Sequence, residues 1–184
     1  SRRQRSKSLD RARELELERW KSLLLAWLNL ERSRSAFTVA EREVPRQVDV
    51  GGLIIEIKAD RLDRFADGTY AILDYKTSDK LSVKDWDGER PEAPQLPLYA
   101  AKSEHGISAV HFAQLVPGDV DLLGHDGDEL QVRLREWKRV VDDLGASFVR
   151  GDAAVDPKHP HQSCEFCKLH ALCRVGELRQ GDEN

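Results

Sequence analysis

One apolar run that ends in alternating charged residues constrains this chain more than any other feature. In the segment Ile72-Leu73-Asp74-Tyr75-Lys76-Thr77, a strand pattern leads directly into an aspartate and a lysine two positions apart. Because successive side chains of a strand point to opposite faces, Asp74 and Lys76 share a face and Tyr75 points the other way. An Asp-x-Lys pair by itself is usually a solvated ion pair. Here it follows the apolar run Ala71-Ile72-Leu73, which predicts that the pair lies at the end of a buried strand.

The order of hydrophobic patterns predicts an α/β (α+β) fold with a mixed central β-sheet flanked by helices. Apolar residues at helical spacing indicate helices, and runs rich in β-branched residues between turn residues indicate strands. The predicted order is an amphipathic helix through Trp20, Leu23, Leu24, Trp27 and Leu28; strands over Phe37–Val50, Leu53–Asp60 and Thr69–Thr77; a helix over Pro94–His105; a strand over Val110–Val116; and a helix carrying Leu130, Leu134, Trp137, Val141, Leu144 and Phe148. A helical crossover would lay the fourth strand parallel to one of the first three.

Length and composition favour one domain of a cytoplasmic protein. The chain has 184 residues, of which 40% are hydrophobic, and no window approaches the roughly 18 consecutive apolar residues of a membrane span. We expect a basic, frayed lead-in over residues 1–12, a folded domain over 13–158 and a cysteine-containing tail over 159–184. The chain begins with Ser1 and contains no methionine, so we expect a piece of a longer protein. The net charge of −4 excludes a uniformly basic nucleic-acid surface and leaves only local basic clusters for phosphate contacts.

A pair of carboxylates suggests a metal site. The hairpin between the second and third predicted strands can bring Asp60 beside Asp74. Carboxylate oxygens at one strand end suit Mg²⁺ or Mn²⁺. Such an ion can activate water and stabilise charge on a phosphodiester, and a neighbouring lysine such as Lys76 can orient the water or neutralise an oxyanion.

The order of three motifs resembles the RecB-like and AddB-like nuclease domains of the PD-(D/E)xK superfamily. The motifs are Ala59-Asp60-Arg61-Leu62-Asp63, Leu73-Asp74-Tyr75-Lys76-Thr77 and Gln95-Leu96-Pro97-Leu98-Tyr99-Ala100. The resemblance implies a restriction-endonuclease-like core, Asp60 and Asp74 as metal ligands with the Tyr75 carbonyl as a further ligand, and Lys76 as the catalytic lysine. It also implies supporting catalytic roles for Gln95 and Tyr99, which lie one helical turn apart; a helix cap and a core contact are the alternative roles. Family members usually carry a histidine on a helix before the first strand, and no histidine here precedes His105.

Three cysteines near the end of the chain have metal-ligand spacing. Cys164, Cys167 and Cys173 form a C-x2-C-x5-C pattern, and thiolates select Zn²⁺ or an iron-sulfur cluster. The pattern resembles part of the iron-sulfur motif of AddB-like nucleases, whose fourth cysteine lies far upstream and is absent here. A 4Fe-4S cluster in the longer protein, zinc with a histidine (His159, His161 or His170) as fourth ligand, and three reduced thiols remain open interpretations. For this chain alone we expect three thiols with neither a cluster nor zinc.

These features together predict a metal-dependent deoxyribonuclease, with an exonuclease-like role in DNA repair or recombination inferred from the resemblance. Basic residues near the motifs would contact phosphates without reading bases; they are Lys58, Arg61, Arg64, Lys80 and Lys84. We expect DNA as partner, together with a helicase-like region or subunit. The alternative is an inactive DNA-binding or scaffold module of a helicase-nuclease complex.

Overall fold

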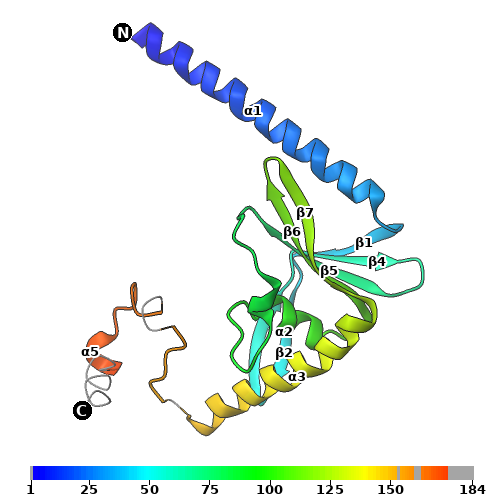
Figure 1. The fold of residues 1–184 in the computed structure, drawn as a ribbon, viewed down its shortest axis with the longest axis vertical. Coiled ribbons are helices and arrows are strands. Elements are labelled where there is room, and N and C mark those ends of the chain that lie inside the picture. Colours follow the sequence, from blue (N-terminus) through cyan, green and yellow to red (C-terminus); the bar gives the residue numbers. More distant parts are fainter. Residues whose placement is uncertain (1, 153, 160–162, 174–184) are drawn as a thin grey trace.

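The predicted class, a mixed sheet flanked by helices, is confirmed by the computed structural model, which describes residues 2–152, 154–159 and 163–173 (Figure 1). Along the chain the elements are α1 (Arg2–Ser33), β1 (Phe37–Arg42), β2 (Pro45–Val50), β3 (Leu53–Lys58), β4 (Arg61–Phe65), β5 (Tyr70–Lys76), the short 3-10 helix η1 (Val83–Trp86), α2 (Gln95–Ala101), β6 (Ile107–Val116), β7 (Asp119–Asp126), α3 (Gly127–Arg150) and α5 (His170–Cys173). Five of these strands form the main sheet in the order β1-β4-β5-β6-β7.

The parallel pair at the centre of the sheet confirms the predicted crossover. Strand β5 pairs with β6 in parallel, and the chain between them contains η1 and α2. The other neighbours in the main sheet pair antiparallel. Strand β5, which carries the Asp-x-Lys pair, therefore lies in the middle of the sheet with a neighbour on each side.

The predicted strand over residues 37–50 is in fact two strands in different sheets. Glu43 has a φ of 51°, a left-handed conformation that is uncommon outside glycine and turns the chain. Beyond it, β2 leaves the main sheet and pairs only with β3. Strands β4 and β7 were not predicted; β4 occupies the stretch between the predicted second and third strands.

Each face of the sheet packs against its own helices because its residues alternate. On one face Ile72, Val110 and Phe112 join a core with Trp86 and Trp137. Trp86 is fully buried, and its ring meets those of Phe112 and Trp137 edge to face at 4.8 and 5.9 Å. On the other face Ala71, Leu73, Ala109 and Ala113 pack around Trp27 of α1. The core aromatic Trp86 thus fixes η1, and with it the loop that follows β5.

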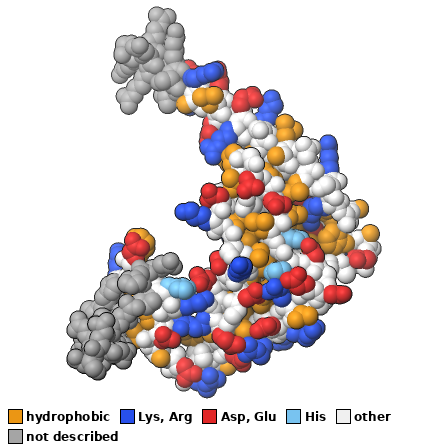
Figure 2. Space-filling view, in the orientation of Figure 1, with side chains coloured by type: hydrophobic (Ala, Val, Ile, Leu, Met, Phe, Trp, Pro, Cys, Tyr) orange, Lys and Arg blue, Asp and Glu red, His pale blue; other side chains and the backbone are white. Residues whose placement is uncertain are grey.

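Helix α1 is longer and more exposed than its sequence pattern predicts. It begins at Arg2, so the stretch expected as a frayed lead-in is helical from residue 2 onward. In the expected apolar stripe, Leu23 and Trp27 are buried, whereas Trp20, Leu24 and Leu28 are each more than half exposed. Only the end of α1 next to β1 reaches the sheet, and the rest projects from the body with hydrophobic side chains at its surface (Figures 1 and 2). No helix within the described ranges is long and apolar enough to cross a membrane.

Candidate functional site

The β4–β5 hairpin brings Asp60 and Asp74 together. Arg61 pairs with Leu73 in the antiparallel register, so the preceding Asp60 lies beside Asp74 on the next strand. The backbone N–H of Tyr75 donates to Asp60 Oδ2 at 2.8 Å. The two carboxylates thus share one strand end and one face of the sheet.

Asp74 is a buried carboxylate whose charge is paired with Lys76. Its relative exposure is 2%, and its Oδ2 lies 2.5 Å from Lys76 Nζ in an ion pair. Burial raises the pKa of Asp74 above its ordinary value, Lys76 works against that rise, and the neighbouring charge of Asp60 adds to it. A cation placed between the carboxylates would remove the repulsion between Asp60 and Asp74.

This donor set fits a hard divalent cation. Two carboxylates at one strand end offer the oxygen ligands that Mg²⁺ and Mn²⁺ prefer, and both ions keep bound water to complete their shell. Within the described residues no cluster of three or more His, Cys, Asp or Glu side chains is arranged to hold a metal. Any ion here would therefore rest on Asp60, Asp74, backbone carbonyls and water.

Tyr75 lies on the opposite face from Asp74 and Lys76, in agreement with the alternation. Its ring meets Trp27 of α1 edge to face at 5.5 Å, and its hydroxyl accepts a hydrogen bond from Arg61 at 2.9 Å. Only the backbone of Tyr75 therefore faces the carboxylates. That placement is compatible with the carbonyl ligand that the resemblance implies.

A cleft of about 740 Å³ opens at this end of the sheet. Its lining consists of Val39, Arg42, Glu43, Asp60, Arg61 and Tyr75. The Glu43 backbone N–H donates to the carbonyl oxygen of Asp60 at 3.1 Å, which places β1 against the start of β4. Glu43 was not among the candidates, because its position depends on the left-handed turn at residue 43, which sequence pattern does not reveal.

Arg61 is not available for phosphate contact. It is 7% exposed, and its guanidinium donates to Asp63, Tyr75 and Glu31. A basic residue beside a motif favours an exposed position, whereas the structure buries Arg61. The alternation in Asp60-Arg61-Leu62-Asp63 contained the signal, since it places Arg61 and Asp63 together on the face opposite Asp60.

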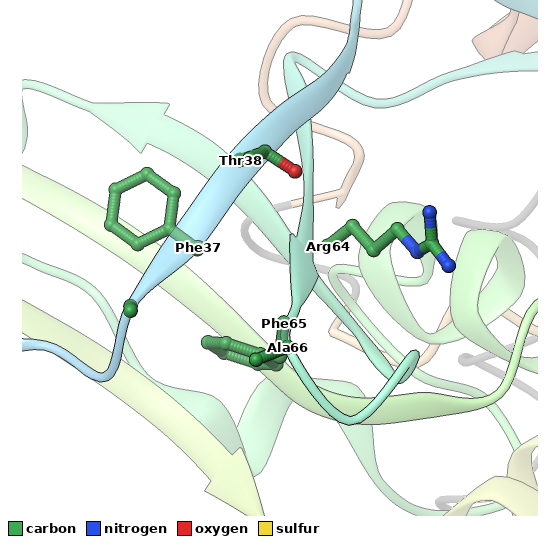
Figure 3. A pocket seen from close by; sticks show the side chains of 6 residues that line it. Phe37, Thr38, Arg64, Phe65 and Ala66 are labelled. Carbon is green, nitrogen blue, oxygen red and sulfur yellow. The ribbon is translucent and has the colours of Figure 1, made fainter.

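The other four basic candidates are exposed. Lys58 makes an ion pair with Glu43 at 3.3 Å, next to the cleft. Lys80 lies in the loop after β5, and Lys84 lies in η1. Arg64 lines a separate hollow at the other end of β4, where its side chain points away from Phe37 and Phe65 (Figure 3). Arg64 therefore lies toward the end of β4 that is opposite Asp60.

The two candidates on α2 differ in their distance from the site. Gln95 is exposed, and its Nε2 lies 3.4 Å from the carbonyl oxygen of Lys58, near Asp60. Tyr99 lies one turn further along and is buried at 4% exposure. Burial raises the pKa of Tyr99, against a hydrogen bond with Arg46 that lowers it. Both side chains face the β2–β3 hairpin: Gln95 contacts Lys58 at the end of β3, and Tyr99 contacts Arg46 of β2.

The three cysteines are partly buried and form no disulfide. The backbone N–H of Cys167 donates to the carbonyl oxygen of Cys164 at 3.2 Å, and Cys173 closes the short helix α5. Of the candidate fourth ligands, His161 lies outside the described residues. The nature of any centre at Cys164, Cys167 and Cys173 stays a prediction.

Comparison with known proteins identifies the family. A model of the PD-(D/E)XK nuclease superfamily matches residues 2–174. No curated protein matches the chain. Among solved structures, the chain is similar to the one described as "Crystal structure of SSO0001", with 18% sequence identity and a TM-score of 0.38, over 73% of this chain and 59% of that one. Because the family model spans the sheet, the carboxylate pair and Lys76, this chain belongs to the PD-(D/E)XK nuclease superfamily.

Proposed function

We propose that this chain is a Mg²⁺- or Mn²⁺-dependent deoxyribonuclease and the exonuclease-like domain of a larger DNA repair or recombination protein. Membership of the superfamily implies a nuclease, a hydrolase that uses divalent metals generally, with DNA as substrate. The choice of metal, the RecB-like or AddB-like subfamily and the repair role are the finer parts of the proposal. A helicase-like partner and a 4Fe-4S cluster on Cys164, Cys167 and Cys173 of the longer protein follow from the same resemblance.

The observation that carries the proposal is the convergence of Asp60, Asp74 and Lys76 on one face at one end of β5. An ordinary surface ion pair would be solvated, whereas Asp74 is almost completely buried and carries a raised pKa. A carboxylate with a perturbed pKa near a cleft is typical of functional sites. The cost of burying Asp74 beside the half-buried Asp60 is understandable where the two carboxylates hold a cation.

The residues divide the work of phosphodiester hydrolysis. Asp60 and Asp74 would hold the metal, with the carbonyl oxygen of Tyr75, the residue between Asp74 and Lys76, as a further ligand. A divalent ion bound there would polarise the phosphodiester and acidify the attacking water. The Lys76 ammonium, whose side chain is 36% exposed, would neutralise charge that develops on the phosphoryl oxygens. The water oxygen would bond to phosphorus and release a proton, the bond to the leaving oxygen would break, and that oxygen would take up a proton, so that the protons balance.

Substrate approach depends on local charge because the net charge is −4. Lys58, Lys80 and Lys84 are exposed near the carboxylate end of the sheet, and we propose that they contact the DNA backbone. Arg64 belongs to the same group if the DNA extends along β4. Gln95 would support the Asp60 segment through its contact with the Lys58 carbonyl.

Degradation of end-labelled single- and double-stranded DNA tests the proposal. Wild type, Asp74→Asn and Lys76→Ala are compared in Mg²⁺ or Mn²⁺, with a chelated sample as baseline. Arg139→Lys is the matched control because Arg139 lies on α3 in exposed ion pairs with Glu89 and Asp143. We expect metal-dependent cleavage by the wild type and by Arg139→Lys, and none by the two site variants.

The remaining outcomes decide against the proposal in different ways. Equal cleavage by the wild type and the site variants would place the activity elsewhere or in a contaminant. A wild type that binds DNA without cutting it would favour the alternative, an inactive DNA-binding or scaffold module. Covalently closed circular DNA separates the two nuclease classes, because an exonuclease leaves it intact.

A further inference from the structure

A buried polar cluster lies directly behind the carboxylate pair, on the opposite face of the sheet. Arg61 binds Asp63 through two hydrogen bonds, Nε to Oδ1 at 2.7 Å and Nη2 to Oδ2 at 3.0 Å. The same guanidinium donates to Glu31 of α1 at 2.8 Å and to the Tyr75 hydroxyl at 2.9 Å. Arg34, also near the end of α1, pairs with Glu31 at 2.7 Å and with Asp63 at 2.9 Å. Two cations and two anions thus neutralise one another between helix and sheet.

This cluster is shielded from water and fixed in geometry. Asp63 is 0% exposed, and the Arg61 and Arg34 side chains are 8% and 9% exposed. Both guanidinium groups lie over the ring of Phe37, at 4.3 Å for Arg34 and 4.9 Å for Arg61. Burial alone would lower the pKa of Arg61, but its hydrogen bonds to Asp63, Tyr75 and Glu31 raise that pKa, so the group stays charged. Because a planar guanidinium donates in fixed directions, the cluster holds its partners at defined positions.

The cluster is joined to the carboxylates by a closed chain of bonds. Arg61 follows Asp60 in β4, and its side chain holds the Tyr75 hydroxyl. Tyr75 lies between Asp74 and Lys76 in β5, and its backbone N–H donates to Asp60 Oδ2 at 2.8 Å. The Tyr75 ring is also wedged against Trp27 of α1. Tyr75 is therefore held at its hydroxyl and its ring on one face of the sheet, while its backbone N–H holds one carboxylate.

We infer that Arg61 and the Tyr75 hydroxyl are positioning residues, which fix the β5 backbone from behind so that Asp60 and Asp74 are held ready for a divalent ion. This inference rests on the proposed function and deepens it. A merely structural cluster would tie α1 to the sheet and affect only folding. A positioning cluster changes metal affinity as well. Replacing a group that orients a metal ligand typically weakens metal binding by about 10- to 100-fold.

The Tyr75→Phe variant separates these roles. It removes the acceptor for Arg61 and keeps the backbone N–H, the carbonyl and an aromatic ring against Trp27. Mn²⁺ alone is the probe, and its dissociation constant is measured without DNA from the electron paramagnetic resonance signal of the free ion. We expect the dissociation constant to rise about tenfold. Thermal unfolding in chelator reports the effect on the fold independently.

Three companion variants sharpen the test. Arg61→Lys keeps the positive charge and loses the forked donor geometry, so it should weaken Mn²⁺ binding as well. If both residues act through one hydrogen bond, the double variant binds no more weakly than the weaker single variant. Arg139→Lys, which exchanges the same residue types in an exposed helix, should bind Mn²⁺ as the wild type does.

The outcomes distinguish this inference from the proposed function. Mn²⁺ affinity unchanged in Tyr75→Phe and Arg61→Lys, with only the melting temperature lowered, overturns the positioning role. A wild type that binds Mn²⁺ and leaves DNA intact overturns the nuclease proposal, while the binding comparison still decides the inference. A wild type that binds no Mn²⁺ overturns both.

Discussion

Replacing Asp63 by asparagine should destabilise the fold more than any loss of a surface charge. Asp63 is fully buried, and its carboxylate contacts both Arg61 and Arg34. The Asp63→Asn variant leaves two buried guanidinium groups with Glu31 as their only carboxylate within the cluster. Breaking a buried ion pair on one side costs about 3–5 kcal/mol. For a domain of this size each kcal/mol lowers the melting temperature by about 2–4 °C, so we expect a fall of roughly 6–20 °C.

Circular dichroism melting curves of metal-free protein measure this effect, with Glu89→Gln as the control. Glu89 pairs at 2.6 Å with Arg139 of α3. Both side chains are exposed, so water screens the interaction. Added salt should change the effect of Glu89→Gln and leave that of Asp63→Asn nearly unchanged, because buried pairs are screened little. Equal, small shifts in the two variants would refute the view that the cluster behind the site holds the fold together.

Three further changes test other parts of the structure. In chelator at neutral pH, Asp74→Asn should raise the melting temperature. Burial raises the folded-state pKa of Asp74, so the ionised carboxylate opposes folding at pH values above that pKa. A lower melting temperature of the variant would contradict this. Burial lowers the pKa of His111 in the folded state, although its partner Asp126 works in the other direction. The neutral ring therefore supports the fold at pH values above the ordinary pKa of 6.5, and this stability is lost as the pH falls from 6.5 toward the lowered pKa. In urea unfolding at pH 7 and pH 5, His111→Gln should lose less stability on acidification than the wild type. In Gly145→Ala the added Cβ would lie 1.9 Å from the Val50 carbonyl oxygen. Overpacking should destabilise the fold by about 1–3 kcal/mol, which outweighs the gain in helix propensity. A more stable variant in the same urea assay would refute the close packing of α3 on β2.

The sequence predicted best those elements whose pattern of apolar residues matches the burial of the faces in the folded protein. Strand β5 is apolar because both its faces are covered, and the alternation at its end fixes the directions of Asp74, Tyr75 and Lys76. The long stripe of α3 predicted a helix for the same reason, and its Leu130 and Trp137 are buried as expected. In both cases local periodicity and tertiary burial give the same answer.

The features that sequence missed depend on long-range packing. The break between β1 and β2 rests on one left-handed residue, Glu43, whose type does not demand that conformation. The apolar stripe of α1 predicted burial of Trp20 and Leu24, yet the sheet covers only the end of the helix that carries Trp27. Periodicity states which residues of a helix share a face; it does not state how far along the helix a partner extends.

The motif around Asp60 shows how strand alternation can serve two purposes at once. Asp60 and Asp74 face the side where a cation would bind, and there the charge of Asp60 adds to the effect of burial in raising the pKa of Asp74. Arg61, Asp63 and Tyr75 face the other side, where every charge has an opposite partner. The two sets of residues alternate along β4 and β5. The hydrogen bonds and ion pairs of Arg61, Asp63 and Tyr75 therefore hold the two strands together where Asp60 and Asp74 lie side by side. The stable face therefore allows the chain to keep two neighbouring carboxylates in place before any metal arrives.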